Sequence, residues 1–152
     1  MNSKLIASAV SALLSFNCAA SGGADTEPSS NRVAQCFGNV FEAYVRTKLN
    51  RLPNPILKVE GARPLESIFN DLDLSGFTYE DKREFCFMVA ISIPRLDAAD
   101  ADTFRYCLRP DAARIAGELL TVSDAILARY FFFSKDRIES YRDLLRSVRA
   151  EQ

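Results

Sequence analysis

Residues 33–49, VAQCFGNVFEAYVRTKL, repeat apolar side chains at the spacing of an amphipathic helix. The apolar positions recur every three or four residues over more than four turns, at Val33, Cys36, Phe37, Val40, Phe41, Tyr44, Val45 and Leu49. Only a helix brings positions with this spacing onto one face. Pro53 and Pro55 should end it, because proline lacks the backbone N–H that continues a helix. The segment predicts a long helix with one buried face.

Shorter segments with the same pattern fill the rest of the chain. We expect helices to begin near Pro64, Thr78, Asp97, Pro110 and Ser134. Residues 85–93, FCFMVAISI, are apolar on every side, which is typical of a helix at the centre of a core. A buried strand is the alternative there, because β-branched residues are frequent in it. We therefore predict an all-α fold, a compact bundle of five to six helices.

The N-terminal segment has the layout of a secretory signal peptide. Lys4 supplies a positive charge, residues 5–16 supply an apolar stretch, and small residues follow up to Ala24. We expect cleavage after Ala20, which removes residues 1–20, with Ala24 as the alternative site. The apolar stretch is shorter than the ~20 residues of a membrane span. We therefore expect an exported protein, periplasmic or extracellular, with no membrane insertion in the mature form.

This segment has two alternative interpretations besides a cleaved signal peptide. The apolar stretch could be a short helix of the fold, or Cys18 could be a lipidated N-terminal cysteine. A lipoprotein signal usually has Leu three places before the cysteine and a small residue directly before it, whereas Ser15 and Asn17 stand here. Residues 21–31 are rich in Ser and Gly and have no apolar period, so we expect a flexible tail before a single helical domain at 32–152.

Charge and composition argue against several classes of function. The 152 residues include 19 Lys+Arg and 20 Asp+Glu, for a formal net charge of −1, without the basic excess that nucleic-acid binding usually requires. The chain contains no His, which removes the Ser-His-Asp, Cys-His and HExxH arrangements. We therefore expect no enzyme, no cofactor and no nucleic-acid partner. A small hydrolase that uses carboxylates is the third choice of function.

Two acidic segments resemble parts of cation sites. Residues 71–76, DLDLSG, match the first half of an EF-hand loop, but Lys82 stands where the bidentate Glu should be. The acids within residues 97–102 are explained by helix capping and solvation. We expect no bound metal.

Removal of the signal peptide leaves three cysteines, Cys36, Cys86 and Cys107. One pair would normally be oxidised in an exported protein. We predict the Cys86–Cys107 disulfide, because two antiparallel helices joined near residues 94–100 would bring these residues together. Pairing of Cys36 with either partner and three buried thiols are the alternatives.

Two segments contain apolar side chains that one buried helix face does not account for. Residues 130–133 read YFFF, and four consecutive aromatic side chains cover all sides of a helix. We predict a partner surface at Phe131 and Phe132, since aromatic residues concentrate at interface centres. The alternative is that the next helix covers these rings. The Ile56-Leu57 pair, in a proline-containing loop, is a second candidate docking spot or a short strand.

By exclusion, these observations favour a small binding protein that acts through contact with another protein. An inhibitor, an immunity-type protein or an adaptor would fit, and a homodimer is compatible with the sequence. The first alternative is a carrier of an apolar small molecule or lipid, because the 11 phenylalanines would suit an apolar cavity between helices.

Overall fold

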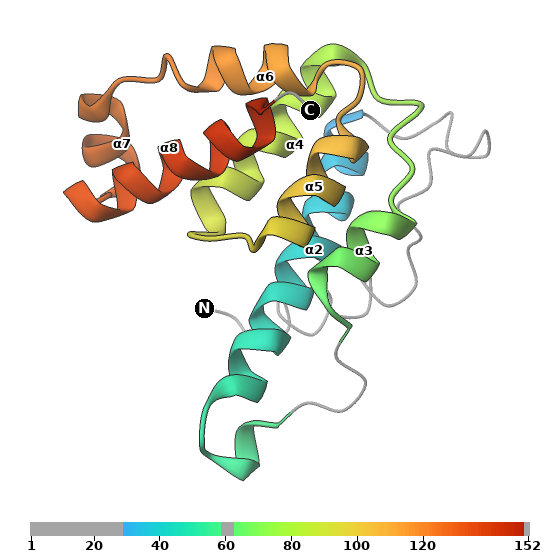
Figure 1. The fold of residues 1–152 in the computed structure, drawn as a ribbon, viewed down its shortest axis with the longest axis vertical. Helices are drawn as coiled ribbons and strands as arrows, with labels where there is room; N and C mark the ends of the chain where they lie inside the picture. The colour runs from blue at the N-terminus through green and yellow to red at the C-terminus, as the bar shows by residue number, and fades with distance from the viewer. Residues whose placement is uncertain (1–28, 59–62, 151–152) are drawn as a thin grey trace.

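The computed structural model describes residues 29–58 and 63–150, and this part of the chain has an all-α fold (Figure 1). The signal peptide expected at 1–20 lies outside the described residues. The helices within them are α2 (Ser29–Arg51), the 3₁₀ turn η2 (Pro55–Leu57), α3 (Leu65–Asp71), α4 (Tyr79–Ser92), α5 (Ala98–Cys107), α6 (Ala112–Leu119), α7 (Asp124–Phe131) and α8 (Lys135–Arg149). Helix α2 includes residues 29–31, which the sequence had assigned to the tail. None of the described helices combines the length and the apolar character needed to cross a bilayer.

Helix α4 forms the centre of the bundle. It packs against α2, α6 and α8, while α3 and α5 pack against each other and connect α2 to α8. Phe85, Cys86, Val89 and Ala90 of α4 are fully buried. The segment that is apolar on every side therefore forms the central helix, as predicted, and the alternative of a buried strand is wrong.

Helix α2 is buried along only part of its length. Its buried side chains end at Ala43, and the remainder extends beyond the other helices (Figure 1). Phe41, predicted for the buried face, is 39% exposed and stacks on Phe37 with 5.6 Å between ring centroids.

Side-chain caps set the first residue of several helices. Thr78, where a helix start was expected, forms a capping box with Asp81 at α4, in which the Thr78 hydroxyl accepts from the Asp81 amide at 3.2 Å and the Asp81 carboxylate accepts from the Thr78 amide at 3.1 Å. Asp97, Ser123 and Ser134 accept from amides in the first turns of α5, α7 and α8. These caps satisfy N–H groups that have no partner within the helix.

The cap at Ser123 begins a helix where the sequence predicted no helix start between Pro110 and Ser134. The apolar pattern from Pro110 continues past Leu120, yet α6 ends at Leu119 and α7 begins at Asp124. The Ser123 hydroxyl accepts from the Ile126 amide at 3.2 Å, and Asp124 lies in the first turn. This start signal interrupts the helix despite the continuing apolar period.

Helix α4 ends where proline removes a hydrogen-bond donor. Pro94 has no N–H to offer the Ala90 carbonyl, and Arg137 of α8 donates to that carbonyl through Nη2 at 2.8 Å. The Arg137 guanidinium also lies 4.5 Å from the centroid of the Phe133 ring. Desolvation by burial lowers the pKa of Arg137. Helix α8 thus supplies a hydrogen bond that the C-terminal end of α4 lacks.

Candidate partner-binding surface

The four aromatic residues at the end of α7 face in two directions. Tyr130 is 66% exposed and Phe132 is 87% exposed. Phe131 and Phe133 instead pack against the core, and the Phe131 ring stands edge-on to Phe87 with 5.5 Å between centroids. Most of the Phe132 side chain is therefore exposed, whereas the Phe131 ring, which the prediction places in the same partner surface, is partly buried against α4.

The backbone at Phe132 explains this alternation. Phe132 adopts the left-handed conformation, with φ 57° and ψ 32°. The amides of Phe132 and Phe133 both donate to the Leu127 carbonyl, which closes the end of α7. This conformation reverses the direction of the chain, so that Phe132 points outward between two inward-facing rings. It costs a residue with a Cβ roughly 1–2 kcal/mol, and glycine or asparagine is usual at such a position.

The outward side of α7 continues the exposed apolar area. Ile126 is 44% exposed and lies one turn before Tyr130. The exposed Arg129 lies beside them, with its guanidinium carbon 5.8 Å from the Tyr130 ring centroid. We call Ile126, Arg129, Tyr130 and Phe132 the α7 surface. It presents three apolar side chains and one cation on a single short helix and its end.

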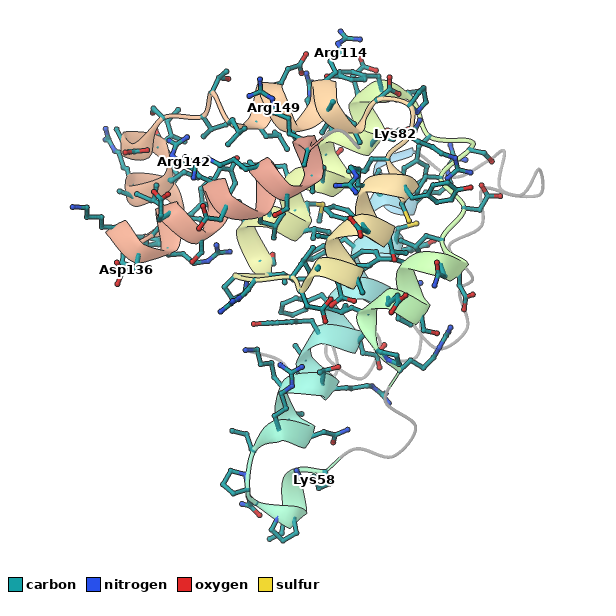
Figure 2. The ribbon with its side chains drawn as sticks, viewed as in Figure 1. Lys58, Lys82, Arg114, Asp136, Arg142 and Arg149 are labelled. Carbon is teal, nitrogen blue, oxygen red and sulfur yellow. The ribbon has the colours of Figure 1, made fainter. Side chains whose placement is uncertain are left out.

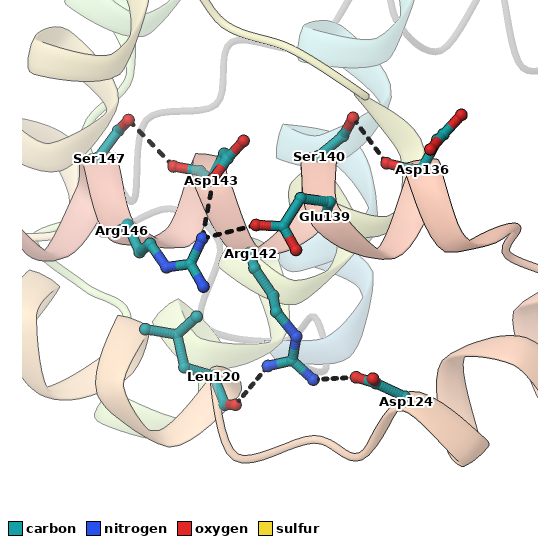
Figure 3. Close-up of polar contacts among 9 residues, drawn as sticks. All are labelled: Leu120, Asp124, Asp136, Glu139, Ser140, Arg142, Asp143, Arg146 and Ser147. Carbon is teal, nitrogen blue, oxygen red and sulfur yellow. Dashed lines mark hydrogen bonds and ion pairs between the residues drawn. The ribbon is translucent and has the colours of Figure 1, made fainter.

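Helix α8 holds the start of α7 in place through Arg142 (Figure 3). The Arg142 guanidinium donates to the carbonyls of Leu120 at 2.9 Å and Val122 at 3.2 Å, and it forms an ion pair with Asp124. One side chain thus binds the end of α6, the connecting loop and the first turn of α7. A partner would meet an α7 surface whose position is already fixed.

Tyr141, the neighbour of Arg142, makes a second connection to α6. Its hydroxyl donates to the Leu119 carbonyl at 2.9 Å from a fully buried position. Burial raises the pKa of Tyr141, which keeps the hydroxyl protonated and able to donate.

The second predicted docking spot lies in another part of the molecule. Ile56 is 87% exposed on η2, which follows the extended end of α2, while α7 lies beside α8 at the other side of the bundle (Figure 1). The side chain of Leu57 lies outside the described residues. The Asn54 side chain accepts from the Ile56 amide at 3.0 Å and so fixes the turn. The structure therefore does not bring the two predicted segments into one surface.

The predicted Cys86–Cys107 disulfide is not formed. Both residues are free, buried thiols. Helix α5 packs mainly on α3 and α8 and not alongside α4, and the Cys107 thiol donates to the Phe69 carbonyl of α3 at 2.9 Å. Burial raises the pKa of Cys86, and it raises the pKa of Cys107 to about 12. These thiols are protonated near neutral pH, which makes them poor nucleophiles.

A buried lysine has a structural explanation. Lys82 of α4 donates through Nζ to the Arg109 carbonyl at 3.1 Å and contacts the Asp111 carboxylate at 3.3 Å. Its position on α4 is labelled in Figure 2. These contacts hold the connection between α5 and α6 against the central helix.

Tyr79 joins α4 to α6 on the outside of the bundle. Its ring lies between two guanidinium groups, with Arg114 at 4.1 Å and Arg83 at 5.8 Å from the ring centroid. Glu118 pairs with both arginines, at 3.1 Å to Arg83 and 3.7 Å to Arg114. The two cations therefore already have an anionic partner.

The EF-hand-like segment is held by contacts within the chain. Asp71 forms an ion pair with Arg63, and the Asp73 carboxylate accepts from the Ser75 amide at 3.0 Å. Hydrogen bonds with Ser75 lower the pKa of Asp73. Within residues 29–58 and 63–150, no cluster of three or more potential ligating side chains could hold a metal ion.

The second acidic segment caps α5. The Asp97 carboxylate accepts from the Asp100 amide at 2.8 Å, which agrees with the capping interpretation. Burial and the nearby charge of Asp97 raise the pKa of Asp100 to about 6.

Several phenylalanines that suggested a ligand cavity pack on one another. The Phe104 ring lies 5.0 Å from Phe69 and 5.9 Å from Phe85, centroid to centroid, and all three rings are buried. Their contacts join α3, α4 and α5.

Sequence reasoning missed Ile126, Arg129 and Tyr130 as parts of an exposed surface. The apolar period that starts near Pro110 continues through Ile126 and Tyr130, which would place both on a buried face of one helix. The Ser123-Asp124 start signal could have indicated a separate helix, with Leu127 and Phe131 as its inward positions.

Comparison with protein-family models, curated proteins and solved structures gives no match for this chain.

Proposed function

We propose that this chain is an exported helical protein that acts by binding another protein through the α7 surface. The exposure of Phe132, at 87%, carries the proposal. An exposed aromatic side chain in a left-handed conformation serves neither solubility nor stability, and departures from local rules of this kind are expected at functional sites.

The neighbours of Phe132 support the same function. Tyr130 and Ile126 enlarge the apolar area, and Arg129 adds a residue type that is enriched, like Tyr, among interface hot spots. The contacts of Arg142 fix the N-terminal end of α7, which lowers the entropy lost on binding. An inhibitor, immunity-type or adaptor role would use such a surface. Export rests on the N-terminal sequence.

A pull-down from the native host tests this proposal. The wild type is compared with Phe132→Ser and with Ile56→Ser, which alters a side chain of equal exposure on η2. We expect a stoichiometric protein partner with the wild type and Ile56→Ser, and its loss with Phe132→Ser. Retention by a folded Phe132→Ser variant would overturn the assignment of the α7 surface, and the absence of any protein partner would overturn the function.

A further inference from the structure

Cations without a described carboxylate partner lie close in the chain to the α7 surface. Arg129 and Lys135 are exposed cations on either side of Phe132 in the chain, and neither forms an ion pair with a described carboxylate. Arg142 neutralises Asp124 at the start of α7. Asp136 lies on the side of α8 turned away from α7 in Figure 2. The exposed apolar side chains are therefore accompanied by two cations that no carboxylate within the described residues pairs with.

We infer that the α7 surface binds an acidic amphipathic segment of the partner protein, whose apolar side chains cover Tyr130 and Phe132 and whose carboxylates pair with Arg129 and Lys135. This inference rests on the proposed function and specifies the chemistry of the partner.

The small extent of the α7 surface suits contact with a single amphipathic segment of the partner better than contact with a broad, flat surface. The three apolar side chains lie on one short helix and the residue that ends it, which is the scale on which an amphipathic segment presents its apolar positions. Complementary charge beside such a contact fixes the orientation of the segment and speeds its association. Arg129 can pair with a carboxylate while its guanidinium stays near the Tyr130 ring.

Two synthetic amphipathic peptides provide the probes. Both peptides carry Leu and Phe at helical spacing. The Glu peptide has Glu at all remaining positions, and the Lys peptide has Lys there. Fluorescence anisotropy with the folded protein at low ionic strength should show saturable binding of the Glu peptide only. The double variant Arg129→Glu/Lys135→Glu should weaken that binding by about tenfold or more, and added salt should weaken wild-type binding.

The control variant is Arg149→Glu, which reverses an exposed charge at the far end of α8 and should leave the affinity unchanged (Figure 2). Equal binding of both peptides, or unchanged binding by the double variant, would overturn the inference. Stronger binding to phosphatidylglycerol vesicles than to the Glu peptide would overturn it in favour of a lipid surface. Self-association through α7 in analytical ultracentrifugation would overturn it in favour of a second copy.

The inference and the proposed function can fail separately. If neither peptide binds while Phe132→Ser still loses the captured partner, the acidic-segment inference fails and the protein-binding function stands. If Phe132→Ser changes neither capture nor peptide binding, both fail.

Discussion

Arg142 of α8 donates through Nη1 to the Leu120 carbonyl at 2.9 Å and thereby joins the middle of α8 to the end of α6. The same guanidinium bonds the Val122 carbonyl and Asp124. Helix α7 has one fully buried side chain, Leu127, besides the partly buried Phe131, so the contacts of Arg142 add to what positions it. The candidate binding surface therefore depends on a residue outside it.

Replacement of Arg142 by Met should lower the free energy of unfolding by about 1–3 kcal/mol, because hydrogen bonds to charged groups are lost in a partly buried site. Urea denaturation measures the change. The control is Arg146→Met, since the carboxylates that Arg146 pairs with among residues 29–58 and 63–150 are the exposed Glu139 and Asp143 of its own helix (Figure 3). It should change stability by no more than about 0.5 kcal/mol. Equal losses in the two variants would contradict the structural role of Arg142.

Replacement of Cys86 by Ser should lower Tm by the same amount with and without reductant. Cys86 is a free, fully buried thiol, and a serine hydroxyl without a partner there costs about 1–3 kcal/mol. Cys107→Ser should cost less, because its hydroxyl can keep the bond to the Phe69 carbonyl. Differential scanning calorimetry provides the comparison. A loss confined to non-reducing conditions would show that Cys86 forms a disulfide.

Replacement of Asp100 by Asn should stabilise the protein at pH 7, and the gain should shrink as the pH falls towards 4. The pKa of Asp100 is about 6 in the folded protein, above its ordinary value of 3.8, mainly through desolvation and then through Asp97. The folded state therefore binds the proton more tightly, so protonation between these values favours folding. Denaturation at several pH values measures the convergence.

An NMR titration provides an independent check on Asp100. The variant Asp97→Ser keeps an oxygen to accept from the Asp100 amide but removes the adjacent negative charge. The pKa of the Asp100 carboxyl should then move downward from about 6. An unchanged pKa would show that the Asp97 charge does not contribute.

Replacement of Phe132 by Gly should raise the free energy of unfolding by about 0.5–1 kcal/mol, because glycine adopts the left-handed conformation without a Cβ clash. Thermal and urea denaturation test this expectation. Partner binding should be lost in the same variant. A destabilised variant would mean that the Phe132 ring contributes to the fold after all.

Local rules predicted much of the fold. The start of α4 after Thr78, the start of α8 after Ser134 and the central position of residues 85–93 follow from neighbouring side chains alone. Each of these features depends on a few consecutive residues, so the sequence is sufficient to recognise it.

Contacts between distant segments could not be predicted from the sequence. The packing of α5 on α3 and α8 decides that Cys107 contacts Phe69 and not Cys86. The position of Phe87 on α4 decides that Phe131 turns inward. The apolar period shows that one face of a helix is buried but not which helix covers it.

Site-specific photo-cross-linking tests the central claim most directly. A photoreactive phenylalanine analogue is placed at position 132 or, as the matched control, at position 56, which is equally exposed on η2. The account predicts that the variant labelled at 132 forms one discrete cross-linked species with a partner protein in the native host, and that the variant labelled at 56 does not. The same product from both positions, or no discrete product from position 132, would contradict it.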